Sequence, residues 1–526
     1  MEDASNGKHE EIGKEDYSRT ISQEQLTNKE PKFVLGRPTL WLVISVIAVT
    51  FGSSAQYGYG IGVLTGPSLT MQDFYNQSNY DRRGEPLSDT GVLWLWSATI
   101  SVWCIGGALG ALVGGYLSDG LGRKGALLMI NIFSLVAAVL FGFAELANSY
   151  EMVIIGRLIH GFYVGTAITI VPLYLAEISP INLRGAIGVI HQLMITIGIL
   201  IGQALGLYAF TAEDSWPILL ALIGVMSAFQ LILLPFCPES PRWLLLNKNK
   251  EEKTRQALVR LRGSDDVEEE IREIREEGSK DVEVEEKVGI VDVITLKDPS
   301  WKMPLLICMI LQGGQQLSGI NAVLFYATEI YRQTGMGAEE VAYATIGTGA
   351  INVVMTIISV YMVERAGRRI LTVVPFGLMA ICLALLTVSL NLQPTFDWMK
   401  WLSLIFIYAY IVSFAVGPGP VPFVIVPELW TQGPRPAAMS IAIQTNWWCN
   451  FLVGLTFPFI QATVGAYSFL VFMFFVILTT IFSYFYVPET KNRTFDDIMD
   501  GFRKGDKSGK KSKGGDYELQ DNANKA

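Results

Sequence analysis

The sequence is poor in charge. Of its 526 residues only 17% are Asp, Glu, Lys or Arg, whereas 51% are hydrophobic and the mean hydropathy is +0.36. Soluble domains carry about 25% charged residues. The charges are also missing from long stretches and gather at the two ends and in one central block. This pattern excludes a water-soluble fold and predicts a chain that lies mostly in lipid.

Residues that usually carry chemistry are scarce as well. The five cysteines stand singly, and the three histidines are isolated from Cys and acids at ligand spacing. We therefore expect no disulfide framework, no metal and no cofactor. No Gly-rich sequence ends in Gly-Lys-Ser or Gly-Lys-Thr, which argues against ATP as a partner. The net charge of -9 argues against nucleic acid, and an enzyme is not expected.

Apolar runs of about 20 residues predict twelve membrane helices. We expect an all-α membrane protein with two six-helix bundles, 38–237 and 301–487, joined by a cytoplasmic helical linker, 238–300. The tails, 1–37 and 488–526, are polar, the first contains no signal peptide, and the second is predicted to be largely disordered. The expected spans are 38–66, 91–116, 125–147, 151–175, 185–210, 215–237, 301–331, 338–363, 370–392, 398–428, 435–461 and 466–487.

The distribution of basic residues predicts the orientation of these spans. If both termini are cytoplasmic, the outer loops hold only Arg82, Arg83, Arg332 and Lys400. Cytoplasmic loops are enriched in Lys and Arg, so this orientation is favoured. It places the sequon at Asn76 in the first outer loop, where glycosylation is expected.

The chain repeats three charged motifs in order, at a shift of 245 to 251 residues. A repeat of this length predicts two duplicated six-helix halves, with a substrate site between them and alternating access by rocking. We expect the motifs to form a cytoplasmic gate whose ion pairs cross between the halves when that side is shut. The alternative is that they only obey the positive-inside rule. The gate residues are Asp119, Arg123, Glu177, Arg184 and Glu239 in the first half, and Glu364, Arg368, Glu428, Arg435 and Glu489 in the second.

Several polar residues fall at membrane depth. Arg157 must face the bundle interior, because an Arg at the bilayer centre costs at least roughly 2.5 kcal/mol. Each amide alone could be a link between helices, but together they suit a neutral polyol, and a Trp face suits a sugar ring. The candidate substrate residues are Gln192, Ile195, Ile199, Gln315, Gln316, Asn321, Asn352, Asn446, Trp447 and Asn450.

Helix breakers lie beside these amides. Their density within one span requires water or protein to satisfy the freed backbone, which predicts a gate hinge, with a kinked structural helix as the alternative. The hinge residues are Gly417, Pro418, Gly419, Pro420 and Pro422.

Six motifs carry a resemblance to a known family: QQLSGINAV from Gln315, VERAGRR from Val363, PESPRW from Pro238, GPGPVPF from Gly417, QGPRPAA from Gln432 and PETKNRTF from Pro488. Over residues 38–500 the chain resembles the sugar porter branch of the major facilitator superfamily, and within it the animal facilitative glucose transporters. The resemblance implies a hexose substrate, a plasma-membrane location and function as a monomer. It also implies that Phe325 and Tyr326 form an extracellular gate. The amides that it implies as hexose contacts are Gln192, Gln315, Gln316, Asn321, Asn352 and Asn446.

Four positions bear on the substrate and on coupling. Ala415 and Phe423 stand where the best known glucose facilitators have Glu and Trp. Asn446 stands where a fructose-selective relative would have His, which favours D-glucose. Gly60 stands where the proton-driven symporters carry Asp, leaving Arg157 without a proton-carrying partner. We therefore predict a D-glucose uniporter. A proton symporter, a fructose-preferring facilitator and a non-transporting receptor stay open.

Overall fold

The computed structural model describes residues 37–209, 213–283, 288–431 and 433–491. Within these ranges it is all-helical, with ten stretches long and apolar enough to cross a membrane. One stretch, Arg435–Tyr486, contains two helices separated by a turn at Gly465. A further crossing, Lys302–Gln333, is broken into three pieces. The structure thus confirms a multi-pass protein with twelve crossings.

The N-terminal half contains the first six crossings. The first is α2 (Leu40–Val49) continued by a π-turn and α3 (Ala55–Gly62), and the sixth is α9 (Trp216–Ala221) with α10 (Ile223–Leu233). A surface helix, α4 (Ser68–Arg83), follows the first crossing. The remaining crossings are α5 (Asp89–Leu121), α6 (Arg123–Phe143), α7 (Tyr150–Ile178) and α8 (Arg184–Ala204).

The C-terminal half repeats this plan with two broken crossings. The first is divided into α15 (Lys302–Leu317), α16 (Ile320–Phe325) and α17 (Ala327–Gln333). The fourth is divided into α20 (Met399–Val416) and α21 (Val421–Glu428). The others are α18 (Ala338–Ala366), α19 (Arg368–Leu392), α22 (Arg435–Val464) and α23 (Ser468–Tyr486).

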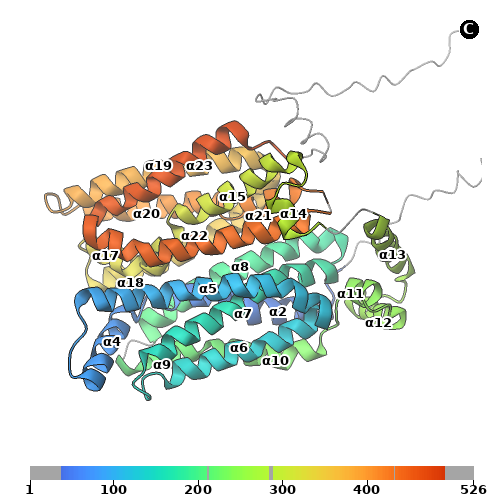
Figure 1. Ribbon diagram of the computed structural model, residues 1–526, viewed down its shortest axis with the longest axis horizontal. Coiled ribbons are helices and arrows are strands. Elements are labelled where there is room, and N and C mark those ends of the chain that lie inside the picture. The colour runs from blue at the N-terminus through green and yellow to red at the C-terminus, as the bar shows by residue number, and fades with distance from the viewer. Residues whose placement is uncertain (1–36, 210–212, 284–287, 432, 492–526) are drawn as a thin grey trace, which may run out of the picture.

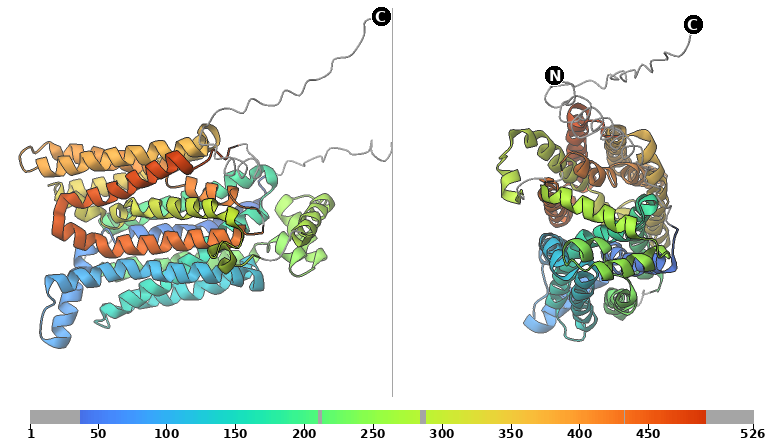
Figure 2. Two further views of the ribbon diagram at one scale, coloured as in Figure 1. Left: turned by 45° about the horizontal axis from the view of Figure 1, so that its top comes forward. Right: turned by 90° about the vertical axis from the view of Figure 1, so that its right-hand side faces the viewer.

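Short helices between the halves lie at one end of the bundle. Figure 1 shows α11 (Pro241–Leu246), α12 (Glu251–Arg262) and α13 (Glu268–Glu283) beyond the ends of the long helices, with α14 (Ile290–Ile294) on the same side. The turned views of Figure 2 show the same arrangement. We call this the linker end, and the opposite end, where α4 and α17 lie, the far end.

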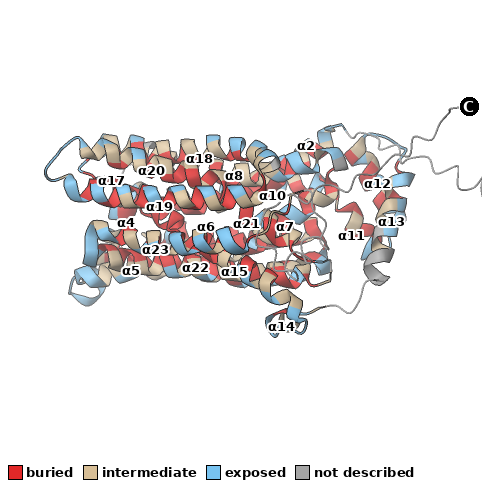
Figure 3. Ribbon diagram, turned by 90° about the horizontal axis from the view of Figure 1, so that it is seen from above, coloured by how far each residue is buried: buried red, intermediate tan, exposed pale blue. Residues whose placement is uncertain are grey.

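The two halves meet through three helix pairs: α5 with α22, α8 with α18, and α3 with α16. Buried residues line the contact between the helices, and exposed ones face outward (Figure 3). Many of the exposed residues are large and apolar, such as Ile132, Ile232 and Phe474. Such a surface suits lipid, because there the outward faces need no polar cover.

Candidate functional site

Amide side chains of α15 and α22 form one hydrogen-bonded network. Asn446 donates to Gln312 Oε1 at 2.8 Å and to Gln315 Oε1 at 2.6 Å. Gln316 donates to Asn446 Oδ1 at 2.9 Å and accepts from Asn321 at 2.6 Å. All five residues are buried. Sequence reasoning brought four of them together but missed Gln312, which lies one helical turn before Gln315 and Gln316 on the same face.

Gln315 connects this network to the break in the tenth crossing. Its Nε2 donates to the carbonyls of Pro418 and Gly419 at 2.7 and 2.8 Å. These carbonyls are freed because the helix stops at Val416 and restarts at Val421. The helix is thus interrupted over Gly417–Pro420, among the helix breakers that the sequence shows, and a protein amide satisfies the backbone that the break releases. Whether the segment acts as a hinge remains a prediction.

Aromatic rings from both halves lie beside the network. Trp447 is buried, with its ring centroid 5.4 Å from that of Trp103 and 6.1 Å from that of Tyr57. The Phe325 ring approaches Trp103 from α16, at 6.3 Å. Gly107 on α5 allows this contact, because a Cβ there would meet the Trp447 ring at 2.4 Å. The rings and amides together offer apolar faces next to donors and acceptors.

The other predicted substrate residues lie outside the amide network, as far as the described residues show. Ile195 and Ile199 are buried on α8, where Gln192 is half-buried. Asn352 is buried on α18. Asn450 is buried one turn beyond Asn446, and its Oδ1 has no hydrogen-bond partner among the described residues. Their contact with a substrate stays a prediction.

The far end is closed between the halves. Phe325 and Tyr326 are buried, and the Tyr326 hydroxyl donates to the Gly454 carbonyl at 3.0 Å. Thr328 Oγ1 donates to the Thr65 carbonyl of the other half at 2.7 Å. Nearer the linker end a groove of about 330 Å³ is lined by Leu112, by Gln444 and by α14. There Gln444 Nε2 donates to the Ala108 carbonyl at 2.9 Å, so a hydrogen bond joins the halves at this level as well.

Arg157 faces the interior, as predicted, and is 1% exposed. Its Nη1 donates to the Gly60 carbonyl at 2.8 Å, its Nε to the Thr99 carbonyl at 3.3 Å, and its guanidinium lies 5.3 Å from the Trp103 ring centroid. A Cβ on Gly60 would lie 2.8 Å from His160 Cε1. The position therefore contributes a carbonyl to Arg157 and has no room for a carboxylate without a shift of His160.

The first charged cluster closes the N-terminal half at the linker end. Arg123 donates from Nε and Nη2 to both oxygens of Glu177, at 2.8 and 2.9 Å, and contacts Asp119 at 3.2 Å. Glu239 accepts from the backbone N–H of Lys124 at 3.0 Å and so caps α6. Burial raises the pKa of the Glu239 carboxyl above its ordinary value, although backbone hydrogen bonds oppose the rise.

The second cluster repeats this geometry in the C-terminal half. Arg368 donates from Nη2 to Glu428 Oε1 at 3.1 Å, and Thr490 Oγ1 donates to Glu428 Oε2 at 2.5 Å. Glu489 accepts from the backbone of Arg368 at 2.9 Å, as Glu239 does for α6. Arg435 donates instead to the carbonyl of Trp430 at 2.9 Å.

The clusters pair within the halves in this structure. Arg123 and Glu177 pair inside the first half, and Arg368 with Glu428 inside the second, and ion pairs across the halves in a state with that side shut stay a prediction. The reason is proximity, because α6 packs on α7 and α19 on α21 within each half. Arg184 is exposed, and the side chain of Glu364 lies outside the described residues. A gating role of the clusters stays a prediction.

Asn76 lies within α4, a helix at the far end. Its Oδ1 accepts from the Leu87 N–H at 2.8 Å, and Ser78 of the sequon is buried and donates to the Asn148 carbonyl. Glycosylation at Asn76 remains a prediction.

Comparisons with known proteins fit this arrangement of site and bundle. The family profile of the sugar (and other) transporters matches residues 45–502. The chain belongs to this sugar transporter family. It is 46% identical over 471 residues to the human solute carrier family 2, facilitated glucose transporter member 5, covering 89% of this chain and 93% of the relative. The member 5 protein of Rattus norvegicus is 44% identical over 481 residues, covering 91% and 95%.

Solved structures give the same fold. The partially occluded inward open conformation of the xylose transporter XylE from E. coli has a TM-score of 0.73 and 25% identity, covering 86% of this chain and 99% of that one. A second structure, that of the proton:xylose symporter XylE bound to 6-bromo-6-deoxy-D-glucose, has a TM-score of 0.70 and 23% identity, covering 88% of this chain and 98% of that one. The chain therefore has the major facilitator fold, and it is a transporter, not an enzyme.

Proposed function

We propose that this sugar transporter is a facilitated hexose transporter that moves its substrate down its gradient by alternating access. The single observation that supports this most is the amide network of Gln312, Gln315, Gln316, Asn321 and Asn446 beside Trp447, at the contact between the halves. Amides both donate and accept, as hydroxyl groups do, and an indole face packs on the C–H face of a sugar.

The environment of Arg157 supports transport without a coupled proton. Its two bonded nitrogens point to the carbonyls of Gly60 and Thr99, which cannot titrate. Proton coupling at this position would require a carboxylate that gains and loses its proton as the Arg moves. The space beside Gly60 is filled by His160. These contacts support uniport, and a symporter that uses another acid is the alternative.

The choice of hexose is the finer part of the proposal. In the sequence analysis Asn446 favours D-glucose as the substrate. In the structure, however, the Asn446 amide is hydrogen-bonded to Gln312, Gln315 and Gln316. Ala415 and Phe423 lack the Glu and Trp of the best known glucose facilitators. The human and Rattus norvegicus relatives named above are both member 5 of the facilitated glucose transporters. We therefore propose that the protein prefers D-fructose, with D-glucose as the alternative substrate.

The proposed setting is the plasma membrane, with both termini and the linker helices in the cytoplasm and the protein working as a monomer. The basic residues of α11–α13 support this orientation, because the far end holds few of them. In it, the linker end faces the cytoplasm and Phe325 and Tyr326 close the outside.

Uptake into liposomes that contain the purified protein tests the substrate. Labelled D-fructose and D-glucose are offered separately, with L-glucose as the control for leakage. We expect saturable uptake of D-fructose that exceeds that of D-glucose. Faster uptake of D-glucose would restore the preference predicted from Asn446. Uptake of neither sugar above the L-glucose level would refute hexose transport.

A further inference from the structure

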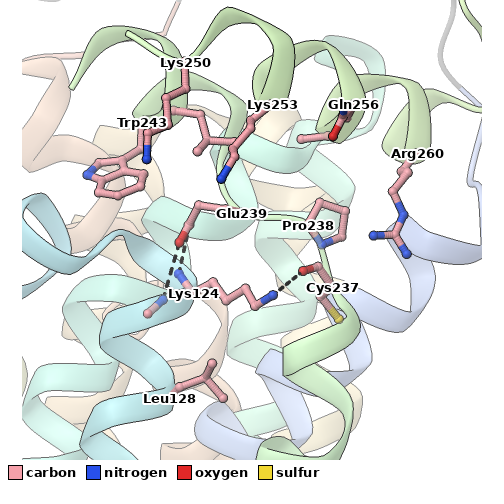
Figure 4. A pocket seen from close by; sticks show the side chains of 13 residues that line it. Lys124, Leu128, Cys237, Pro238, Glu239, Trp243, Lys250, Lys253, Gln256 and Arg260 are labelled. Atoms are coloured by element: carbon pink, nitrogen blue, oxygen red, sulfur yellow. Dashed lines mark hydrogen bonds between the residues drawn. The ribbon is translucent and has the colours of Figure 1, made fainter. Parts of the chain in front are cut away.

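A cavity lies between the N-terminal half and the linker helices, away from the amide network. Its volume is about 490 Å³, within the range of ligand pockets. The N-terminal end of α6 and the segment Cys237–Glu239 form one side, and α11 with α12 form the other. Figure 4 shows Lys253 and Arg260 on α12, opposite Lys124 and Glu239.

The walls carry an excess of positive charge. Lys124, Lys250, Lys253 and Arg260 line the cavity, with Glu239 as the single carboxylate among its lining residues. Both oxygens of Glu239 accept backbone N–H groups, those of Lys124, Gly125 and Ser240. The carboxylate is thus already engaged.

Among the described residues, none of the four cations forms a direct ion pair with a carboxylate, although Glu239 lies near Lys124. Lys124 Nζ donates to the carbonyls of Pro235 and Cys237, at 2.6 and 2.9 Å. The guanidinium of Arg260 lies over the Trp41 ring at 4.2 Å. By contrast, other basic residues of α12 do pair, Arg255 with Glu268 and Arg262 with Glu270. The uncompensated charges of α12 therefore face the cavity.

Apolar surface adjoins this charge. Leu128, Pro238 and Leu244 form part of the cavity wall. Just before Cys237, Phe236 is 63% exposed, and Ile232 one turn earlier is 65% exposed. They continue the outward face of the sixth crossing, which suits acyl chains. A ligand with an anionic group and an apolar part fits both surfaces.

We propose that this cavity binds a phosphate-bearing ligand between the N-terminal end of α6 and α12. Lysine is a common phosphate binder, and several basic residues around one site neutralise a doubly charged phosphate monoester. The phosphate belongs either to the headgroup of an anionic phospholipid or to a soluble phosphate ester. Bound there, it would tie the linker helices to α6, which also carries Arg123 of the first charged cluster.

The test measures binding by titration calorimetry on the full-length protein in detergent. The two probes are dioctanoyl phosphatidic acid and glycerol phosphate, which is the same headgroup without acyl chains. The test variant combines Lys250→Ala with Lys253→Ala. Arg255→Ala is the matched control, because it removes one positive charge from α12 outside the cavity.

We expect the double variant to bind phosphatidic acid about 30-fold more weakly, since each basic residue near an anionic headgroup contributes roughly 1 kcal/mol. The control should bind like the parent, and salt should weaken binding in both. Binding of phosphatidic acid alone identifies a lipid ligand, and equal binding of glycerol phosphate identifies a soluble ester. Unchanged affinity in a double variant with the parent's thermal unfolding midpoint overturns the proposal, as does binding of neither probe.

Discussion

In the N-terminal half Arg123 holds both oxygens of Glu177, whereas in the C-terminal half Arg368 holds one oxygen of Glu428. The side chains of the first pair are 9% and 7% exposed, and those of the second are 17% and 29% exposed. The motifs are the same, so their surroundings make the difference. Trp243 on α11 donates to the Asp119 carbonyl and covers the first cluster.

The halves differ in the opposite sense near the membrane centre. The C-terminal half has the broken crossings α15–α17 and α20–α21, with the amide network between them. In the N-terminal half the buried amides hydrogen-bond to side chains of the same half. Gln230 is bonded to Ser53 and Asn131, and all three residues are buried. The two duplicated halves therefore differ. The N-terminal half has the more deeply buried charged cluster, and the C-terminal half has two helices broken around polar groups.

The largest expected effect separates the two clusters. Arg123→Ala leaves the buried Glu177 without its partner, which should destabilise the protein by about 3 kcal/mol. Arg368→Ala exposes a carboxylate that water already reaches, so we expect about 1 kcal/mol at most. Thermal unfolding of the purified variants measures both. Arg184→Ala, at an exposed site, is the control. Equal losses for the two clusters would show that burial does not distinguish them.

A second difference concerns the amides of the two halves. Gln315→Ala releases the Pro418 and Gly419 carbonyls, so it should cost about 1–3 kcal/mol of stability and lower hexose uptake about tenfold. The sequence alone predicts loss of transport with intact folding, because it places Gln315 against a wet cavity. Gln192→Ala, at a half-buried site, should lower uptake without changing the unfolding midpoint. Normal uptake by Gln315→Ala would remove the network from the substrate site.

The glycines before the two clusters should respond alike. Gly122 and Gly367 have φ of 88° and 87°, and a Cβ would meet the carboxylates of Glu239 and Glu489 at 2.4 and 2.5 Å. Replacement of either by Ala should cost about 1–3 kcal/mol. Unfolding midpoints of both variants check this, with Gly185→Ala, which has open space, as control. A clear difference between them would mean that the two caps are not equivalent.

The smallest expected effect comes from Glu239. Burial raises its pKa in the folded protein, so its contribution to stability is fully present below the unfolded pKa and is lost as pH rises through the folded pKa. As the pH rises through the folded pKa of Glu239, the thermal unfolding midpoint of the parent should therefore fall slightly relative to that of Glu239→Gln. Parallel pH profiles of parent and variant would contradict the raised pKa.

Much of the fold follows from the sequence, because apolar length and Gly or Pro density are local properties. These predict the twelve crossings and place helix breakers at Gly417, where the tenth crossing is interrupted. The partners of charged residues are not local. Spacing places Arg123 and Glu177 at helix ends but does not show that α6 packs on α7. For the same reason Gln312 was missed and the bond of Gln315 to the tenth crossing was unforeseen.

The most direct test of the account is the final level of labelled hexose in liposomes, measured with and without an inward proton gradient. Because Arg157 contacts the Gly60 carbonyl and this position carries no carboxylate, we predict that the inside concentration stops at the outside concentration in both cases. A higher level driven by the gradient would contradict uniport and assign proton coupling to another acid.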